Sequence, residues 1–167
     1  MNNIDEYQLG ESSDELRITT REECAALTIA LAAQAQTEIY IFSEDLEPDL
    51  YNSNAFIDAV RHMLGNDTNA KVSILVHDIS RVVQRGHKLI DLSRRASSRV
   101  ELRKLNTKYH HAFMVVDGVG MVDRRRAERF ETVANFNDPS EARNLQRFFK
   151  SVWEKSGMSL EARALHV

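Results

Sequence analysis

Short apolar runs, rich in β-branched and aromatic residues, alternate along this chain with longer segments of helical periodicity. The apolar runs predict strands at 38–43, 71–77, 99–105, 113–116, 119–122 and 130–136. The periodic segments predict helices at 20–36, 54–65, 80–97 and 139–157. Helices and strands alternate first and a hairpin follows, so the sequence predicts an α/β/α sandwich with a mixed β-sheet.

Several residues mark where these helices begin or break. Thr20 and Glu23 form a capping box, and Asp138 can cap the helix that Pro139 opens. Gly86 lies inside the third helical segment, so we expect that segment to divide in two there.

The composition is that of a single soluble globular domain. No apolar run approaches the roughly 20 residues that span a bilayer, and the acidic N-terminus is unlike a signal peptide. The single cysteine, Cys24, excludes an internal disulfide; it fits a reducing cytoplasm and predicts a buried structural thiol. We expect a flexible acidic tail at 1–18, a folded domain at 19–157 and a C-terminal tail at 158–167.

Charge is distributed unevenly, although the net charge is only −3. Residues 1–60 hold 13 acidic and 2 basic residues, whereas residues 81–129 hold 13 basic and 5 acidic residues. The basic half would suit a surface that faces phosphate. Alternatively, the two halves pair with each other, within one chain or across a dimer.

The segment at 109–126 carries the candidate chemistry. Two histidines, His110 and His111, open an apolar run, and Asp117-Gly118 closes it before a second short apolar run. Asp-Gly between two strand-forming runs is a strong hairpin signal. Side chains alternate along a strand, so His110 and Ala112 share one face and His111 lies on the other. A one-residue slip would exchange the two histidines.

This segment resembles the signature of the phospholipase D superfamily: His, any residue, Lys, four residues, Asp, and Gly-Ser-x-Asn one strand later. His110 takes the histidine place and Asp117, seven residues on, takes the aspartate place. Ala112 stands in the lysine place, and Asp123 with Arg124–Arg126 follows the return strand in place of Gly-Ser-x-Asn. The chain is therefore identified as a degenerate single-motif member of bacterial type.

The end of the chain extends this resemblance over roughly residues 20–156. The pattern Asn137-Asp138-Pro139, with Phe149 and Trp153 farther on, is similar to the usual end of a phospholipase D half-domain. The resemblance thus implies the same α/β plan that the periodicity predicts.

The resemblance also implies a mechanism. In the family, one histidine attacks a phosphodiester without a metal, and a second histidine, from a second motif, protonates the leaving group. The lysines contact the phosphate, and each aspartate supports a histidine. One motif in this chain implies a homodimer whose motifs meet at a twofold axis. The empty lysine place at Ala112 weakens the chemistry, because losing one charge-stabilising donor costs on the order of 10²–10³ in rate.

Other side chains could supply the missing contact to phosphate. Lys108 lies two residues before His110, and an arginine of Arg124, Arg125 or Arg126 could contact phosphate through its forked donors. Such an arginine could equally fill the pocket by pairing with Asp117 or Asp123. Asn135 and Asn137 could stand in for the asparagine of the signature, or could simply lead into the last helix.

Three hypotheses follow from these residues. The first is a catalytically degenerate domain that binds a phosphate-containing small molecule or nucleic acid, or acts as a dimeric interaction module. The second is an active metal-independent phosphodiesterase or nuclease repaired by a nearby Arg or Lys. The third is an α/β module that binds a protein through its acidic N-terminal segment. The sequence predicts no metal and no cofactor, because it lacks paired cysteines, His-x3-His and a phosphate loop.

Overall fold

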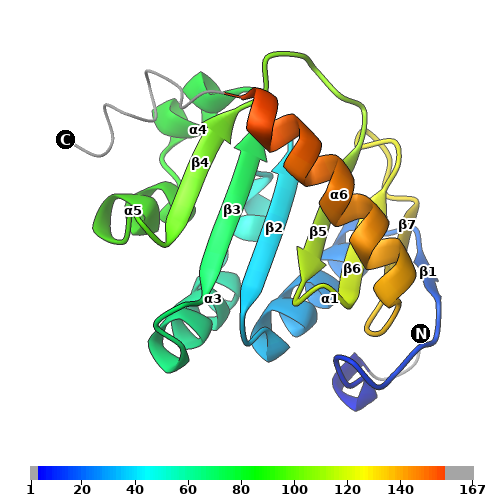
Figure 1. The fold of residues 1–167 in the computed structure, drawn as a ribbon. Helices are drawn as coiled ribbons and strands as arrows, with labels where there is room; N and C mark the ends of the chain where they lie inside the picture. Colours follow the sequence, from blue (N-terminus) through cyan, green and yellow to red (C-terminus); the bar gives the residue numbers. More distant parts are fainter. Residues whose placement is uncertain (1–3, 157–167) are drawn as a thin grey trace.

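A computed structural model describes residues 4–156 of the chain as an α/β/α sandwich (Figure 1). Its central sheet has seven strands: β1 (Leu16–Ile18), β2 (Glu38–Ser43), β3 (Lys71–Val76), β4 (Val100–Lys104), β5 (Ala112–Val116), β6 (Gly120–Arg124) and β7 (Thr132–Asn135). They lie in the order β1-β7-β6-β5-β2-β3-β4. Strands β2, β3 and β4 are parallel, and the other neighbours are antiparallel, so the sheet is mixed as predicted.

Helices cover both faces of the sheet. One face packs against α1 (Arg21–Gln34), α2 (Pro48–Tyr51), α3 (Asn54–Asn66), α4 (Ile79–Arg85) and α5 (Lys88–Arg95). The other face packs against α6 (Pro139–Lys155), which crosses in front of the strands in Figure 1. Successive residues of a strand therefore enter two different cores: Met114 lies on the α1 face, and Phe113 and Val115 lie on the α6 face.

The predicted helices and strands are present, with differences at their ends. Thr20 caps α1 and Asp138 caps α6, each by accepting a backbone N–H with its side chain. Gly86, with φ of 78°, separates α4 from α5. Helix α6 ends at Lys155; the predicted end at Gly157 and the predicted tail at 158–167 lie outside the described residues.

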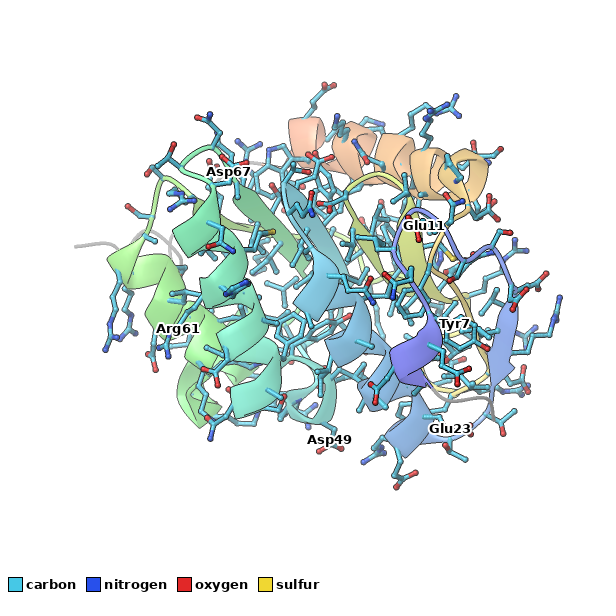
Figure 2. All side chains as sticks on the ribbon, turned by 90° about the horizontal axis from the view of Figure 1, so that it is seen from below. Tyr7, Glu11, Glu23, Asp49, Arg61 and Asp67 are labelled. Atoms are coloured by element: carbon cyan, nitrogen blue, oxygen red, sulfur yellow. The ribbon has the colours of Figure 1, made fainter. Side chains whose placement is uncertain are left out.

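The prediction of a flexible tail at 1–18 does not hold for residues 4–18. Strand β1 pairs with β7 at one edge of the sheet, and the short 3-10 helix η1 (Ile4–Glu6) precedes it. The ring of Tyr7 stacks on Phe136 at 5.5 Å, and Figure 2 shows the segment with Tyr7 and Glu11 lying against the fold. Three residues are too few to show strand periodicity, and the acidic composition around them conceals the buried positions.

The β5–β6 hairpin is fixed to the neighbouring strand by Asp117. Asp117 and Gly118 both have positive φ, 54° and 68°, as a type I′ turn requires. The Asp117 carboxylate accepts hydrogen bonds from the backbone N–H groups of Gln36, Thr37 and Glu38 and from the Thr37 hydroxyl, at 2.9–3.0 Å. These bonds tie the turn to the start of β2.

His87 joins the loop after β2 to the helices behind the sheet. Its ring is only 4% exposed; Nδ1 accepts the Leu89 N–H at 3.1 Å and Nε2 donates to the Leu46 carbonyl at 2.9 Å. This pattern requires the neutral ring, and burial lowers the pKa of His87 to about 4.

We expect Asp117→Ala to destabilise the fold by about 2 kcal/mol, because four donors lose a charged acceptor and alanine tolerates positive φ poorly. Urea unfolding would measure the change. Thr37→Val, which removes only one of the four bonds, should cost less than half as much. Equal stability of Asp117→Ala and the unaltered protein would contradict this role.

Acid should remove the stabilisation that neutral His87 provides. The folded pKa of about 4 lies below the unfolded value near 6.5, so this contribution is present above pH 6.5 and declines as the pH falls towards 4. The full loss corresponds to about 3 kcal/mol. Unfolding measured across this range should show a smaller decline for His87→Asn, which can still cap α5 but does not titrate; equal declines would refute the assignment.

Candidate functional site

A cavity of about 380 Å³ lies at the edge of the sheet where β2 ends and β5 begins. Carboxylates of the β2–α2 loop, the segment from Lys108 to His110, and side chains of β5 and β6 surround it. Ligands commonly bind at the carboxyl ends of parallel strands in α/β sheets. The cavity also brings together His110, Lys108, Ala112 and Arg124, four positions that the sequence connected with phosphodiester chemistry.

The register of the hairpin places Arg124 beside Ala112. These two residues are direct partners across β5 and β6, so their side chains leave the same face of the sheet. Ala112 stands in the lysine place of the signature, so Arg124 is the neighbour of that place on the same face of the sheet. Arg125, the next residue, faces the opposite side.

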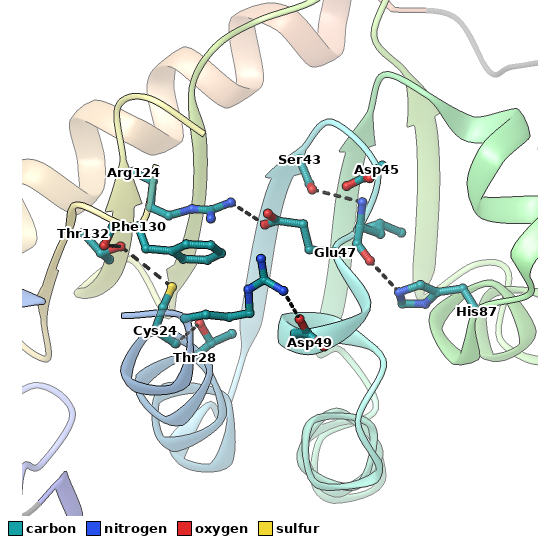
Figure 3. A network of polar contacts seen from close by, with 12 residues as sticks. Cys24, Thr28, Ser43, Asp45, Glu47, Asp49, His87, Arg124, Phe130 and Thr132 are labelled. Carbon is teal, nitrogen blue, oxygen red and sulfur yellow. Dashed lines mark hydrogen bonds and ion pairs between the residues drawn. The ribbon is translucent and has the colours of Figure 1, made fainter. Parts of the chain in front are cut away.

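Arg124 is almost fully buried and is held by Glu47 and Phe130. Its side chain is 3% exposed; the guanidinium donates from Nη2 to Glu47 Oε2 and lies 4.9 Å from the centre of the Phe130 ring (Figure 3). Arg21 lies against the same ring, also at 4.9 Å, and bonds Asp49 at 2.9 Å. Burial raises the pKa of Glu47, and the nearby Arg124 opposes that rise.

Lys108 and His110, which also line the cavity, lie near carboxylates. Lys108 Nζ lies 3.2 Å from Glu44, and His110 Nδ1 lies 3.9 Å from Glu128. The His110 side chain is 75% exposed. Arg124, Lys108 and His110 thus each lie beside a carboxylate of the same chain.

Asp117 lies at the far end of β5 from His110. Seven residues of extended chain correspond to roughly 23 Å. The Asp117 carboxylate is engaged with the start of β2 and does not contact His110. In this fold the motif aspartate therefore secures the hairpin, and it does not orient the histidine.

The remaining predicted ligand-binding residues lie elsewhere. Arg125, Arg126 and Asn135 line a separate groove of about 700 Å³ beside β1, β6, β7 and the start of α6. The Asn135 side chain donates to the Ser13 carbonyl and accepts the Asn137 N–H, so it joins loops of the fold. The structure thus divides the predicted set between two faces of the sheet.

His111 belongs to the α6 side of the sheet. Its Nε2 donates to the carboxylate of Asp123, which is 6% exposed and has Arg125 Nε 4.0 Å from its second oxygen. The ring packs 5.0 Å from that of Phe113. This pair satisfies a buried carboxylate within the core and lies outside the cavity.

Two residues that hold Arg124 in place, Glu47 and Phe130, were not predicted from the sequence. Neither belongs to the signature, and Glu47 lies 77 residues from Arg124 along the chain. The sequence signal that could have indicated such pairs was the separation of acidic and basic residues into two halves of the chain. Several ion pairs join these halves within one chain: Asp45 with Arg81 and Arg85, Glu44 with Lys108, and Glu47 with Arg124.

Cys24 lies beneath Arg124 on α1. It is fully buried, as predicted, and accepts a weak hydrogen bond from the Thr132 hydroxyl at 3.8 Å (Figure 3). Burial raises the pKa of its thiol, with Arg124 opposing the rise, so the thiolate is disfavoured.

Residues 4–156 contain no cluster of three or more side chains suited to hold a metal ion. Within the same part of the chain, no helix is both long enough and apolar enough to cross a membrane.

Solved structures with this arrangement include phospholipase D relatives. Nuc from Salmonella typhimurium, a phospholipase D family member, matches with a TM-score of 0.58 and 16% identity over 87% of this chain and 100% of its own. NucT from Helicobacter pylori matches with a TM-score of 0.63 and 10% identity over 87% and 99%. These likenesses establish the fold, which is that of the phospholipase D-like superfamily, as the sequence predicted.

TrmBL2, an archaeal chromatin protein whose structure shows a mode of DNA binding, also matches, with a TM-score of 0.64 and 19% identity. The match covers 89% of this chain, which spans about half, 55%, of TrmBL2.

Sequence comparison gives the family. No curated protein sequence matches this chain. Residues 20–165 match the family described as Domain of unknown function (DUF7931). Since this match covers most of the 167 residues, the chain belongs to that family, within a phospholipase D-like fold.

Proposed function

We propose that this chain is a non-hydrolytic phospholipase D-like domain that acts as an interaction module. The observation that carries the proposal is the Arg124–Glu47 pair beside Ala112. The place of the phosphate-contacting lysine is taken by a cation that a carboxylate of the same chain already engages.

Hydrolysis of a phosphodiester requires positive charge that is free to meet the developing negative charge on the phosphate oxygens. In the cavity, Arg124 is engaged by Glu47 and Lys108 by Glu44. His110 is exposed and stands apart from Asp117, so nothing of the motif fixes its ring or its tautomer. These features favour a domain that binds over one that turns over a substrate.

The alternative of a repaired phosphodiesterase depends on Lys108 or an arginine. Lys108 does line the cavity with His110, which keeps this alternative testable. The ion pair between Lys108 and Glu44 weakens the case for a phosphodiesterase, because an incoming phosphate would have to displace the carboxylate from the lysine. Arg125 and Arg126 face the other groove and are poorly placed for the same task.

A homodimer is part of the proposal, because the cavity and His110 are open to solvent at one edge of the fold. A second copy related by a twofold axis could cover this edge without any further component. We also propose a reducing cytoplasmic location, which the single buried cysteine favours.

We expect the pure protein in chelator to leave an activated phosphodiester unhydrolysed above the buffer rate, and His110→Ala to give the same trace. The reason is the missing free cation, worth on the order of 10²–10³ in rate for each donor. Release of the chromogenic alcohol measures turnover. Activity that His110→Ala abolishes would overturn the proposal, and Lys108→Ala would then show whether that lysine had replaced the missing one.

We expect light scattering after size exclusion to give twice 19.1 kDa. His110→Glu should shift the protein towards monomer, since it would bring carboxylates together at the twofold axis. His62→Glu makes the same change on exposed α3, far from the cavity, and should leave the mass unchanged. A monomer at all concentrations, or equal behaviour of the two variants, would refute the dimer.

A further inference from the structure

We propose that the Glu47 carboxylate binds Arg124 where an external oxyanion would otherwise bind. When this carboxylate is neutral or displaced, the cavity accepts an external oxyanion. The ligand class is a sulfate or phosphate group. This inference rests on the proposed function only because it treats the cavity as a binding site. It adds that Glu47 controls access of a ligand to Arg124.

Arg124 has a donor group that nothing in the fold satisfies. Its Nη2 donates to Glu47, but its buried Nη1 has no hydrogen-bond partner among the described residues. Buried polar groups are nearly always paired, so the unpaired and almost inaccessible Nη1 leaves this guanidinium short of one acceptor. A tetrahedral oxyanion offers several acceptor oxygens and can engage more than one nitrogen of the guanidinium, whereas the Glu47 contact uses only one.

Arg124 shares its cavity with two further side chains that can donate to an oxyanion. Phe130 lies against one face of the guanidinium, and Ala112 beside it supplies no polar group. Lys108 and His110 line the same cavity and can contribute further donors. An entering oxyanion would therefore meet Arg124 with Lys108 and His110 nearby.

The Glu47 side chain can move without moving its loop. The neighbouring Leu46 is fastened at both backbone groups, since its N–H donates to the Ser43 hydroxyl at 3.0 Å and its carbonyl accepts from His87. Glu47 itself is 28% exposed, so the carboxylate has a path to solvent by side-chain rotation. Displacement therefore costs an ion pair and does not require refolding of the β2–α2 loop.

Several charged groups face Glu47 and set when it becomes neutral. Burial and Asp45 of its own loop raise its pKa, whereas Arg124 from β6 and Arg21 from α1 lower it, and the rise prevails. Tyr51 from α2 and Cys24 from α1 are neutral, because burial raises the pKa of both. Mild acid should therefore release Arg124 before it protonates an exposed glutamate.

Sulfate tests the inference, because its charge stays constant from about pH 8 to about pH 5 and it cannot be hydrolysed. The protein carries His110→Gln throughout, so that the cavity contains no histidine. We expect calorimetry to show sulfate affinity rising about tenfold or more as the pH falls across this range. Glu47→Gln should bind at the higher affinity at every pH, and Glu47→Gln with Arg124→Gln should not bind.

Asp123→Asn is the control, since it removes a carboxylate of β6 that lies on the opposite face of the sheet, away from Arg124. It should retain the pH dependence of sulfate binding. Circular dichroism establishes that each variant folds, and the unaltered Glu47 protein at acid pH gives a readout should Glu47→Gln fail to fold. Weak sulfate binding at all pH values, or equal binding with and without Arg124, would overturn the inference.

The two proposals fail separately. Phosphodiester turnover that depends on His110 would overturn the non-hydrolytic function and leave the role of Glu47 to the sulfate titration. If sulfate does not bind, the proposed oxyanion site is refuted, but the proposal that the domain does not hydrolyse phosphodiesters still stands.

Discussion

A buried guanidinium needs acceptors for its charge and its N–H groups, and in the cavity of this protein a carboxylate supplies one of them. The type I′ turn at Asp117-Gly118 sets the register of the hairpin, and the register places Arg124 opposite Ala112 on the buried face. An unpaired charge there would cost several kcal/mol, so the fold must bring an acid to it. Glu47, at the start of α2, is that acid.

The two ends of β5 have different tasks as a result. At the turn, Asp117 uses its carboxylate on the start of β2 and holds the central strands together. At the other end, the strand borders the cavity, where His110 is exposed and Arg124 is buried. A spacing that resembles one catalytic motif therefore corresponds to two separate places in the fold, one structural and one lining a possible binding site.

The sequence predicted the sheet well because its strands are continuous apolar runs and the Asp-Gly turn is unambiguous. It missed β1, where three residues carry no periodicity and pairing with β7 decides the structure. It assembled Arg124, Arg125 and Arg126 into one ligand set, but alternation along the strand sends Arg124 and Arg125 to opposite faces. Glu47 could not be predicted, since its contact with Arg124 is made only by the folded sheet.

Carboxylate and phosphate satisfy an arginine through the same kind of charged hydrogen bond, so either can occupy such a site. A carboxylate from the same chain has the advantage that it loses no translational freedom on binding. An external oxyanion can compete only if it makes contacts that Glu47 does not, and the unpaired Nη1 of Arg124 is one such contact. The balance between the two depends on the charge of Glu47, which burial has already made easier to neutralise. The same ion pair that disfavours hydrolysis is therefore also the feature through which binding at this site could be controlled.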